Sequence, residues 1–178
     1  MDILVIDDVI SSGYQEHIEQ MFNDGFPWFY TPRVTIDIES DPNTGFSHLL
    51  FEDGQIYSNH YGSVLPIFFE ALDKCKDTLR CDSLFRVRAG MFIQEQNKNP
   101  HVPHRDFEFE HMVMLYYVSD SDGSTKIYND DKTEIVDEIP PKRGRVVFFD
   151  GKTYHASASP KNHQSRIVIN YNFLGTTL

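Results

Sequence analysis

The sequence is poor in cysteine and lacks long apolar runs. The first shortage argues against a disulfide-rich protein or one that binds zinc through cysteines, and the second argues against a membrane-spanning one. Its two cysteines, Cys75 and Cys81, are too few for a disulfide framework, and their spacing matches no common zinc pattern. They indicate two unreactive thiols in a reducing compartment. No apolar run approaches the roughly 18 residues needed to cross a bilayer, and no basic signal-like segment opens the sequence. We therefore expect a cytoplasmic protein with no membrane partner.

Positive charge is also scarce. The 178 residues include 16 Lys and Arg against 27 Asp and Glu, which gives a formal net charge of −11. Nucleic-acid binding relies on basic side chains that release counterions from phosphates, so we expect no nucleic-acid partner. The one tight basic cluster, Lys142, Arg143 and Arg145, is interpreted as a solvated turn before a strand rather than as a phosphate site.

Aromatic residues, in contrast, are plentiful. The 14 Phe and 9 Tyr favour packed strands over a helical bundle, and the length suits one domain spanning residues 1–178. Ser12 and Gln15 have the spacing of a capping box, which predicts a helix ending near Phe22. Apolar residues three and four apart predict a second helix from Val64 to Cys75.

After these helices the hydrophobic period changes to two. Phe85, Val87, Ala89, Met91 and Ile93 alternate with polar or small residues, which predicts one face of a half-buried strand. Shorter strands separated by turn residues are expected at 112–118, 125–128, 133–136, 145–149, 154–157 and 166–173. Many short strands with regular turns are typical of a sandwich or barrel. The predicted fold class is therefore mostly β, a jelly roll braced by N-terminal α-helices.

An ordered set of metal-binding side chains occurs in this β region. His104 and Asp106 are two residues apart, and such residues share one face of an extended backbone. His155 follows on a separate predicted strand, and Arg166 lies on the last one. Two histidines and a carboxylate on one face of an ion form the facial triad of non-haem iron(II) oxygenases, which leaves the opposite face open for other ligands. A lone His-x-Asp is a weak signal, so the prediction depends on the ordered set.

In these residues the sequence resembles the iron(II)/2-oxoglutarate-dependent oxygenase family, most closely its prolyl 4-hydroxylase-like branch. The matching pieces are His104-Arg105-Asp106, 113–118, 122–125, 142–149, His155-Ala156-Ser157 and 166–170. The resemblance covers about half the chain and implies a double-stranded β-helix core at about 84–174. It also implies Fe(II) held by His104, Asp106 and His155, with 2-oxoglutarate and O₂ as cosubstrates and ascorbate as an optional further cofactor.

The resemblance assigns residues to 2-oxoglutarate as well. Arg166 matches the family arginine that pairs with the distal carboxylate, a role that suits a planar guanidinium. A tyrosine on the strand after His-x-Asp often hydrogen-bonds the same carboxylate, and by position Tyr117 is the first choice and Tyr116 the second. Where the family often has a tyrosine before the first histidine, this sequence has Gln94, an amide that can also donate. The family turn Gly-Gly-x-Thr is present as Gly123-Ser124-Thr125.

The implied reaction is hydroxylation of a peptidyl substrate, such as a prolyl residue, or of a small amino-acid-like molecule, with release of succinate and CO₂. The sequence gives no signal for an oligomeric state. By strand parity alone, the candidates for lining the barrel are Val113, Leu115, Phe148, Val168 and Asn170. Trp28 and Phe29 are candidates for a hydrophobic rim, with ordinary core packing as the equal alternative.

Two other functions stay open at this point. A cupin-like metalloenzyme would use zinc or manganese without redox chemistry, although it would not require Arg166. A non-catalytic jelly-roll module would bind a sugar or a partner protein and would require no ordered metal-binding set. The pair His101-x-x-His104 could suggest zinc, but no second pair with finger spacing follows.

Overall fold

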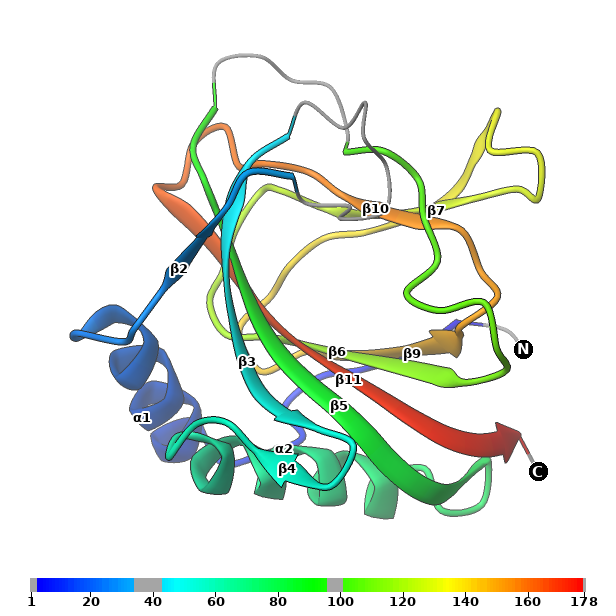
Figure 1. Cartoon of the computed structure of the whole chain (residues 1–178), viewed down its shortest axis with the longest axis horizontal. Helices are drawn as coiled ribbons and strands as arrows, with labels where there is room; N and C mark the ends of the chain where they lie inside the picture. The colour runs from blue at the N-terminus through cyan, green and yellow to red at the C-terminus, as the bar shows by residue number, and fades with distance from the viewer. Residues whose placement is uncertain (1–2, 34–42, 96–100, 178) are drawn as a thin grey trace.

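The computed structural model describes residues 3–33, 43–95 and 101–177, which consist mainly of antiparallel strands (Figure 1). Its helices are α1 (Ser12–Asn23) and α2 (Tyr61–Lys74). Its strands are β1 (Leu4–Ile6), β2 (Phe29–Thr31), β3 (Gly45–Glu52), β4 (Gln55–Ile56), β5 (Leu79–Ile93), β6 (Met112–Tyr117), β7 (Thr125–Tyr128), β8 (Ile135–Ile139), β9 (Val146–Asp150), β10 (His155–Ser157) and β11 (Ser165–Thr177). In the described ranges, neither helix is long and apolar enough to span a bilayer.

The strands form a larger and a smaller sheet. The larger follows the order β1-β9-β6-β11-β5-β3-β2, with β4 paired to β3, and the smaller follows β10-β7-β8. Neighbouring strands pair antiparallel throughout these sheets. Figure 1 shows the two helices beneath the larger sheet, with β7 and β10 on its opposite side. The predicted mostly-β, double-stranded β-helix fold braced by helices is confirmed.

Two hydrophobic cores lie on the two faces of the larger sheet. One joins the sheet to the helices and includes Ile18 and Phe68, and the other lies between the sheets and includes Ile127 and Ile139. β6 contributes to both, since side chains alternate across a strand and every residue of β6 is buried. Because both faces of β6 are buried, its sequence is a continuous apolar run and shows no alternation of apolar and polar residues.

Strand parity placed most barrel-lining candidates correctly but failed for Phe148. Val113, Leu115 and Val168 lie in the core between the sheets, and Asn170 lines the pocket described below. Phe148 instead lies in the helix-side core. Its neighbours on β9, Val147 and Phe149, take the inner positions. The parity of this strand could not be read from the sequence because both of its faces are buried.

A bulge in β5 breaks the predicted alternation at Phe85. Val87, Ala89 and Met91 pack in or against the helix-side core, but β11 pairs Asn172 with Arg86 and Phe173 with Leu84. The skipped residue, Phe85, packs against Phe107, with ring centroids 5.2 Å apart. Because a bulge shifts the side chains beyond it, a strict period of two gives the wrong face for this residue.

The first helix begins one residue earlier than a capping box at Ser12 requires. Its N-cap is Ser11, whose side chain accepts from the Tyr14 backbone N–H. The Gln15 amide is turned away from the cap and donates to Ile10 O at 3.0 Å. Trp28 lies in the cluster of Phe22 and Phe26, against the helix-side core, which is the packing alternative rather than a rim.

Gly123 occupies a close approach near the start of β7. A methyl group there would lie 2.3 Å from the carbonyl oxygen of Ala158 and 3.1 Å from Cδ of Arg166. Because the backbone has little room to yield, Gly123→Ala is expected to lower the free energy of unfolding by about 1–3 kcal/mol in chemical denaturation. A methyl group added at Gly13 in α1 would have no other atom within 4 Å, so Gly13→Ala should stabilise by about 0.5–1 kcal/mol. Equal unfolding midpoints for both variants would contradict this packing.

Candidate metal and cosubstrate site

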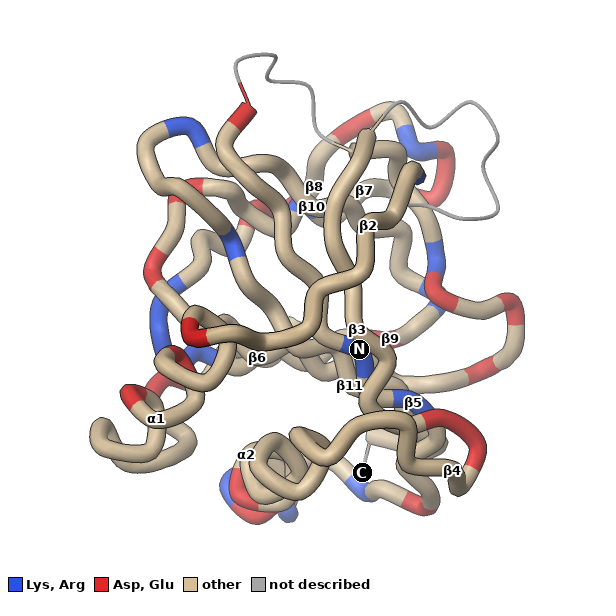
Figure 2. The backbone as a smooth tube through the Cα atoms, turned by 60° about the vertical axis from the view of Figure 1, so that its left-hand side comes forward, with Lys and Arg blue, Asp and Glu red and all other residues tan. Residues whose placement is uncertain are grey.

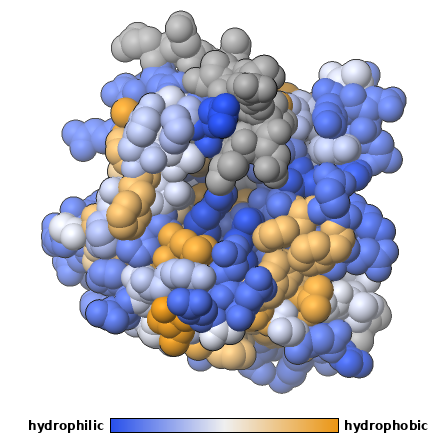
Figure 3. All heavy atoms as spheres, in the orientation of Figure 1, coloured by the Kyte–Doolittle hydropathy of each residue, from blue (hydrophilic) through white to orange (hydrophobic). Residues whose placement is uncertain are grey.

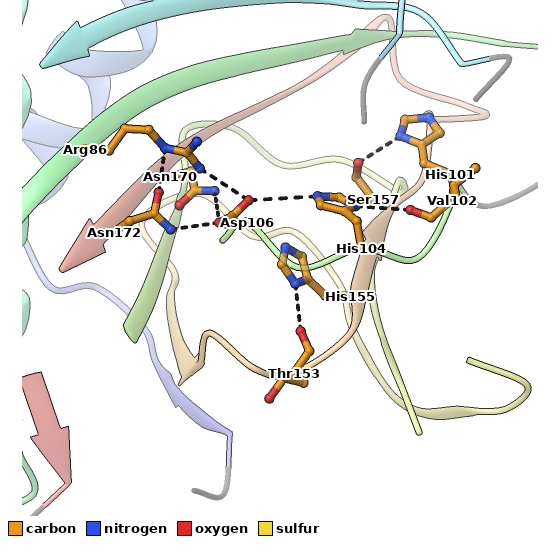
Figure 4. A network of polar contacts seen from close by, with 10 residues as sticks. All are labelled: Arg86, His101, Val102, His104, Asp106, Thr153, His155, Ser157, Asn170 and Asn172. Atoms are coloured by element: carbon orange, nitrogen blue, oxygen red, sulfur yellow. Dashed lines mark hydrogen bonds and ion pairs between the residues drawn. The ribbon is translucent and has the colours of Figure 1, made fainter. Parts of the chain in front are cut away.

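His104 and His155 lie side by side because their backbones pair. His155 begins β10 and exchanges two backbone hydrogen bonds with His104, each 3.0 Å long. Directly opposed residues of an antiparallel pair extend their side chains to the same side. The two imidazole rings accordingly have centroids 4.7 Å apart, as Figure 4 shows.

Asp106 completes the cluster from the same loop as His104. Its side chain is 3% exposed, and its Oδ1 lies 3.9 Å from Nε2 of His104. One potential ligand atom from each of His104, Asp106 and His155 lies within 4.8 Å of the others. In the part of the chain that the structure describes, this is the only such group of His, Cys, Asp and Glu.

Backbone carbonyls set the orientation of both imidazoles. Nδ1 of His104 lies 3.1 Å from Val102 O, and Nδ1 of His155 lies 3.1 Å from Thr153 O. Only a protonated Nδ1 can donate to a carbonyl, which places the lone pair of each neutral ring on Nε2. Carbonyl contacts of this kind commonly orient metal-binding histidines.

Burial keeps His155 neutral. Its desolvation, together with the nearby His104, lowers the pKa of His155 to about 4 against the opposing effect of Asp106. The ring is therefore unprotonated near pH 7, as metal binding requires.

Asp106 is held by groups from β5 and β11. The amides of Asn170 and Asn172 both donate to its Oδ2 at 2.8 Å. Arg86 lies 3.3 Å from Oδ1 through Nη2 and donates through Nε to Asn172 Oδ1 at 2.9 Å (Figure 4). With Oδ2 occupied by two amides, Oδ1 is the oxygen on the side of His104.

The same contacts keep Asp106 ionised. Burial alone would raise the pKa of this carboxyl, but its interactions with the neighbouring His155 ring and with the Arg86 guanidinium, together with the hydrogen bond from Asn170, outweigh it. The pKa of Asp106 therefore lies well below its usual range. The sequence analysis missed Arg86 and Asn172 as supports of this carboxylate. The only available signal was polar residues two apart on otherwise apolar strands.

Arg166 is buried without a counter-ion. It is 1% exposed and donates through Nη2 to Thr125 Oγ1 at 2.7 Å. Among the described residues, its Nε and Nη1 find no hydrogen-bond partner, and no carboxylate pairs with it. Because a buried unpaired charge is costly, this guanidinium is arranged for an anion that the chain itself does not supply.

Tyr117 and Thr125 extend the donor set around Arg166. The Tyr117 hydroxyl donates to Thr125 Oγ1 at 2.6 Å, so that oxygen accepts from both neighbours. With its two lone pairs used, the Thr125 O–H is available as a donor. Tyr116 points the other way, into the helix-side core.

Two other predicted or considered residues lie apart from this group. Gln94 follows the end of β5, is exposed, and donates to Lys161 O at 2.5 Å. Phe92, two residues earlier, lines the pocket instead. His101 is 1% exposed, and its Nδ1 lies 2.8 Å from Ser157 Oγ. It lies outside the triad, so the His101-x-x-His104 pair does not form a metal site here.

The triad and Arg166 open onto one pocket of about 500 Å³, counted to its mouth. This size lies within the range of small-molecule sites. Its lining residues are Arg88, Gly90, Phe92, His104, Asp106, Leu115, Thr125, His155, Ser157, Arg166, Val168 and Asn170. A molecule with an anionic end at Arg166 would therefore have its other end near the triad.

Comparisons with known proteins agree with this geometry. Residues 91–174 match the family model of the 2OG-Fe(II) oxygenase superfamily, a segment that contains the triad and Arg166. No curated protein matches the sequence.

Solved structures resemble the whole fold at low identity. An oxidoreductase of the 2OG-Fe(II) oxygenase family from Burkholderia pseudomallei has a TM-score of 0.71 and 10% identity, covering 96% of this chain and 84% of its own. The viral collagen prolyl hydroxylase of Paramecium Bursaria Chlorella virus-1 has a TM-score of 0.63 and 15% identity, covering 97% and 96%. The non-heme α-ketoglutarate-dependent epimerase SnoN from nogalamycin biosynthesis has a TM-score of 0.65 and 14% identity, covering 97% and 77%.

At these identities the solved structures support the fold, while the family model identifies the segment that holds the candidate site. The chain is therefore similar to the 2OG-Fe(II) oxygenase superfamily over residues 91–174 and shares its fold with these solved structures over nearly its whole length.

Proposed function

We propose that the protein is an Fe(II)- and 2-oxoglutarate-dependent dioxygenase in which His104, Asp106 and His155 bind the metal. The residues fit such an ion. Two imidazoles and one ionised carboxylate are suitable ligands for Fe(II), and three ligands leave positions for further ones. The outer contacts that fix both rings and the carboxylate are those expected around a metal site.

The observation that carries the 2-oxoglutarate assignment is the buried Arg166. Its Nε and Nη1 lack partners among the described residues, so the guanidinium has N–H groups left to donate to the oxygens of a bound carboxylate. The adjacent Thr125 and Tyr117 hydroxyls add donors beside this guanidinium. A non-redox cupin-like enzyme or a binding module would not require a buried cation facing the metal ligands.

The chain's own contribution is orientation and exclusion of water. Arg166 and Thr125 anchor the distal carboxylate, so that the reactive end lies toward the triad. Leu115 and Val168 form an apolar wall of the same pocket, which limits water near the reacting groups. When bound, Fe(II) and 2-oxoglutarate supply the activation of O₂ and the oxidation, with release of succinate and CO₂.

The reaction we propose is hydroxylation of a peptidyl, for example prolyl, substrate or of a small amino-acid-like molecule. The likeness to a viral collagen prolyl hydroxylase supports this choice, whereas the epimerase shows that a similar fold serves another outcome. Two free thiols suit the reducing cytoplasm we propose as its location. One of them, Cys75, has its pKa raised to about 11 by burial and is unreactive.

The proposal is tested with anaerobically purified protein. Fe(II) and 2-oxoglutarate are added without O₂, and the visible absorption of the chelate complex is recorded together with metal content. O₂ is then admitted and succinate is quantified. We expect one Fe(II) per chain, a 2-oxoglutarate-dependent absorption band and succinate release that stops when Zn²⁺ replaces Fe(II). Metal binding without any response to 2-oxoglutarate would contradict the proposal.

A further inference from the structure

We propose that Arg88 binds a carboxylate of the primary substrate, so that the substrate is a small amino-acid-like acid rather than an internal segment of a peptide. This inference rests on the proposed function, since it names the substrate class of the same site. The evidence for it is a second pocket beside the triad pocket, because Arg88 lines both.

The second pocket adjoins the first across β5. It measures about 270 Å³ to its mouth, and its lining residues are Thr31, Gly45, Phe46, Ser47, Arg88, Gly90 and Phe92. The last three also line the triad pocket. Gly90 stands between Arg88 and Phe92 without a side chain, and the nearest atom to a methyl there would be Cγ1 of Val168 at 3.9 Å. A molecule in the second pocket can therefore extend toward the metal ligands.

Arg88 differs from the two other inner arginines in its partners. Arg86 on the same strand pairs with Asp106, and Arg166 is assigned to the cosubstrate. The Arg88 side chain is half-buried and takes part in none of the side-chain hydrogen bonds or ion pairs of the described residues. Its charge also disfavours that of Arg86, so an anion bound at Arg88 would offset a repulsion between neighbouring cations.

The net negative charge of the protein disfavours the entry of any anion, so binding one requires a specific cation. With a net charge of −11, the molecule repels anions at long range. Figure 2 shows Asp and Glu mainly in the peripheral loops, and Figure 3 shows hydrophilic residues at the centre of one face between separate hydrophobic patches. An anion that enters against this field needs a specific cation, and Arg88 lines both pockets.

The rest of the second pocket suits a small acid. The hydroxyls of Thr31 and Ser47 lie 2.9 Å apart and can both hydrogen-bond a ligand, while Phe46 and Phe92 offer apolar contact. Its volume is at the small end for ligand sites. An internal peptide segment presents neutral amides there, whereas a free amino-acid derivative presents a carboxylate that pairs with a guanidinium.

The test compares probes that differ only in charge. N-acetyl-proline, N-acetyl-leucine and N-acetyl-phenylalanine are each paired with their neutral amide. Binding is measured by ligand-observed NMR on protein loaded with Zn²⁺ and saturating 2-oxoglutarate, so that Arg166 is occupied and no turnover occurs. We expect at least one acid to bind about tenfold more tightly than its amide, as charged hydrogen bonds do. Arg88→Gln should bring that ratio close to one.

Arg80→Gln is the matched control, because Arg80 lies on the same strand but is exposed and paired with Asp82. It should keep the preference for the acid. A ratio near one for every pair in the parent, or a preference that survives in Arg88→Gln, would overturn the inference. So would a large loss of 2-oxoglutarate affinity in Arg88→Gln, which would make Arg88 a cosubstrate residue. Failure of the proposed function is distinct, since the parent itself would then not bind 2-oxoglutarate.

Discussion

Replacing His155 with alanine is expected to weaken Fe(II) binding by at least about 100-fold and to abolish succinate release. Loss of an outer contact to a metal ligand already costs about 10- to 100-fold in affinity, and here a ligand itself is removed. The fold should survive, because the pairing with His104 uses backbone atoms that alanine keeps. Metal content after dialysis and anaerobic Fe(II) titration measure the affinity.

Thermal unfolding provides a readout that does not depend on activity. A ligand that binds only the folded state at 100 times its Kd stabilises it by about 2.7 kcal/mol. Metal should therefore raise the unfolding temperature of the parent and leave that of His155→Ala unchanged. His48→Ala is the matched control, since His48 is 6% exposed against 5% for His155 but packs against Phe26 in the helix-side core. If His155→Ala still bound Fe(II) like the parent, the proposed ligand set would be wrong.

The parts of the site visible in the sequence are those that depend on local spacing. His104 and Asp106 are two residues apart, so their shared side follows from extended backbone alone. The strand that carries Arg166 was evident from its apolar run. The meeting of His155 with His104 needed one correct pairing between distant segments, which the resemblance to a known family supplied.

Other parts of the site depend on which face a doubly buried strand presents. Tyr117 was chosen before Tyr116 by position in the family alone, and in the structure Tyr117 lies in the core between the sheets while Tyr116 lies in the helix-side core. Gln94 was chosen by its place before His104, where the family often has a tyrosine, but it follows the end of β5 at Ile93 and is exposed. The bulge at Phe85 leaves no trace in the hydrophobic period. Because Arg86 lies beside that bulge, its contact with Asp106 could not be predicted either.

Replacing Arg166 with methionine is expected to raise the Kd of 2-oxoglutarate by about 10- to 100-fold while Fe(II) binding stays within about threefold. The loss corresponds to one or two charge-assisted hydrogen bonds. Methionine fills a similar volume without a charge. Since the ligand-free parent buries a guanidinium with two unpaired nitrogens, removing that charge should not destabilise the ligand-free protein and can stabilise it.

This combination separates a ligand-binding role from a structural one. If Arg166 only supported the fold, Arg166→Met would unfold at lower temperature and 2-oxoglutarate would still stabilise what remained folded. If it binds the cosubstrate, the variant is at least as stable alone but gains clearly less stability from the same concentration of 2-oxoglutarate than the parent does. Arg166→Lys keeps the charge but loses the planar fork, so its affinity should lie between the two. Equal 2-oxoglutarate affinity in parent and Arg166→Met would refute the carboxylate-binding role.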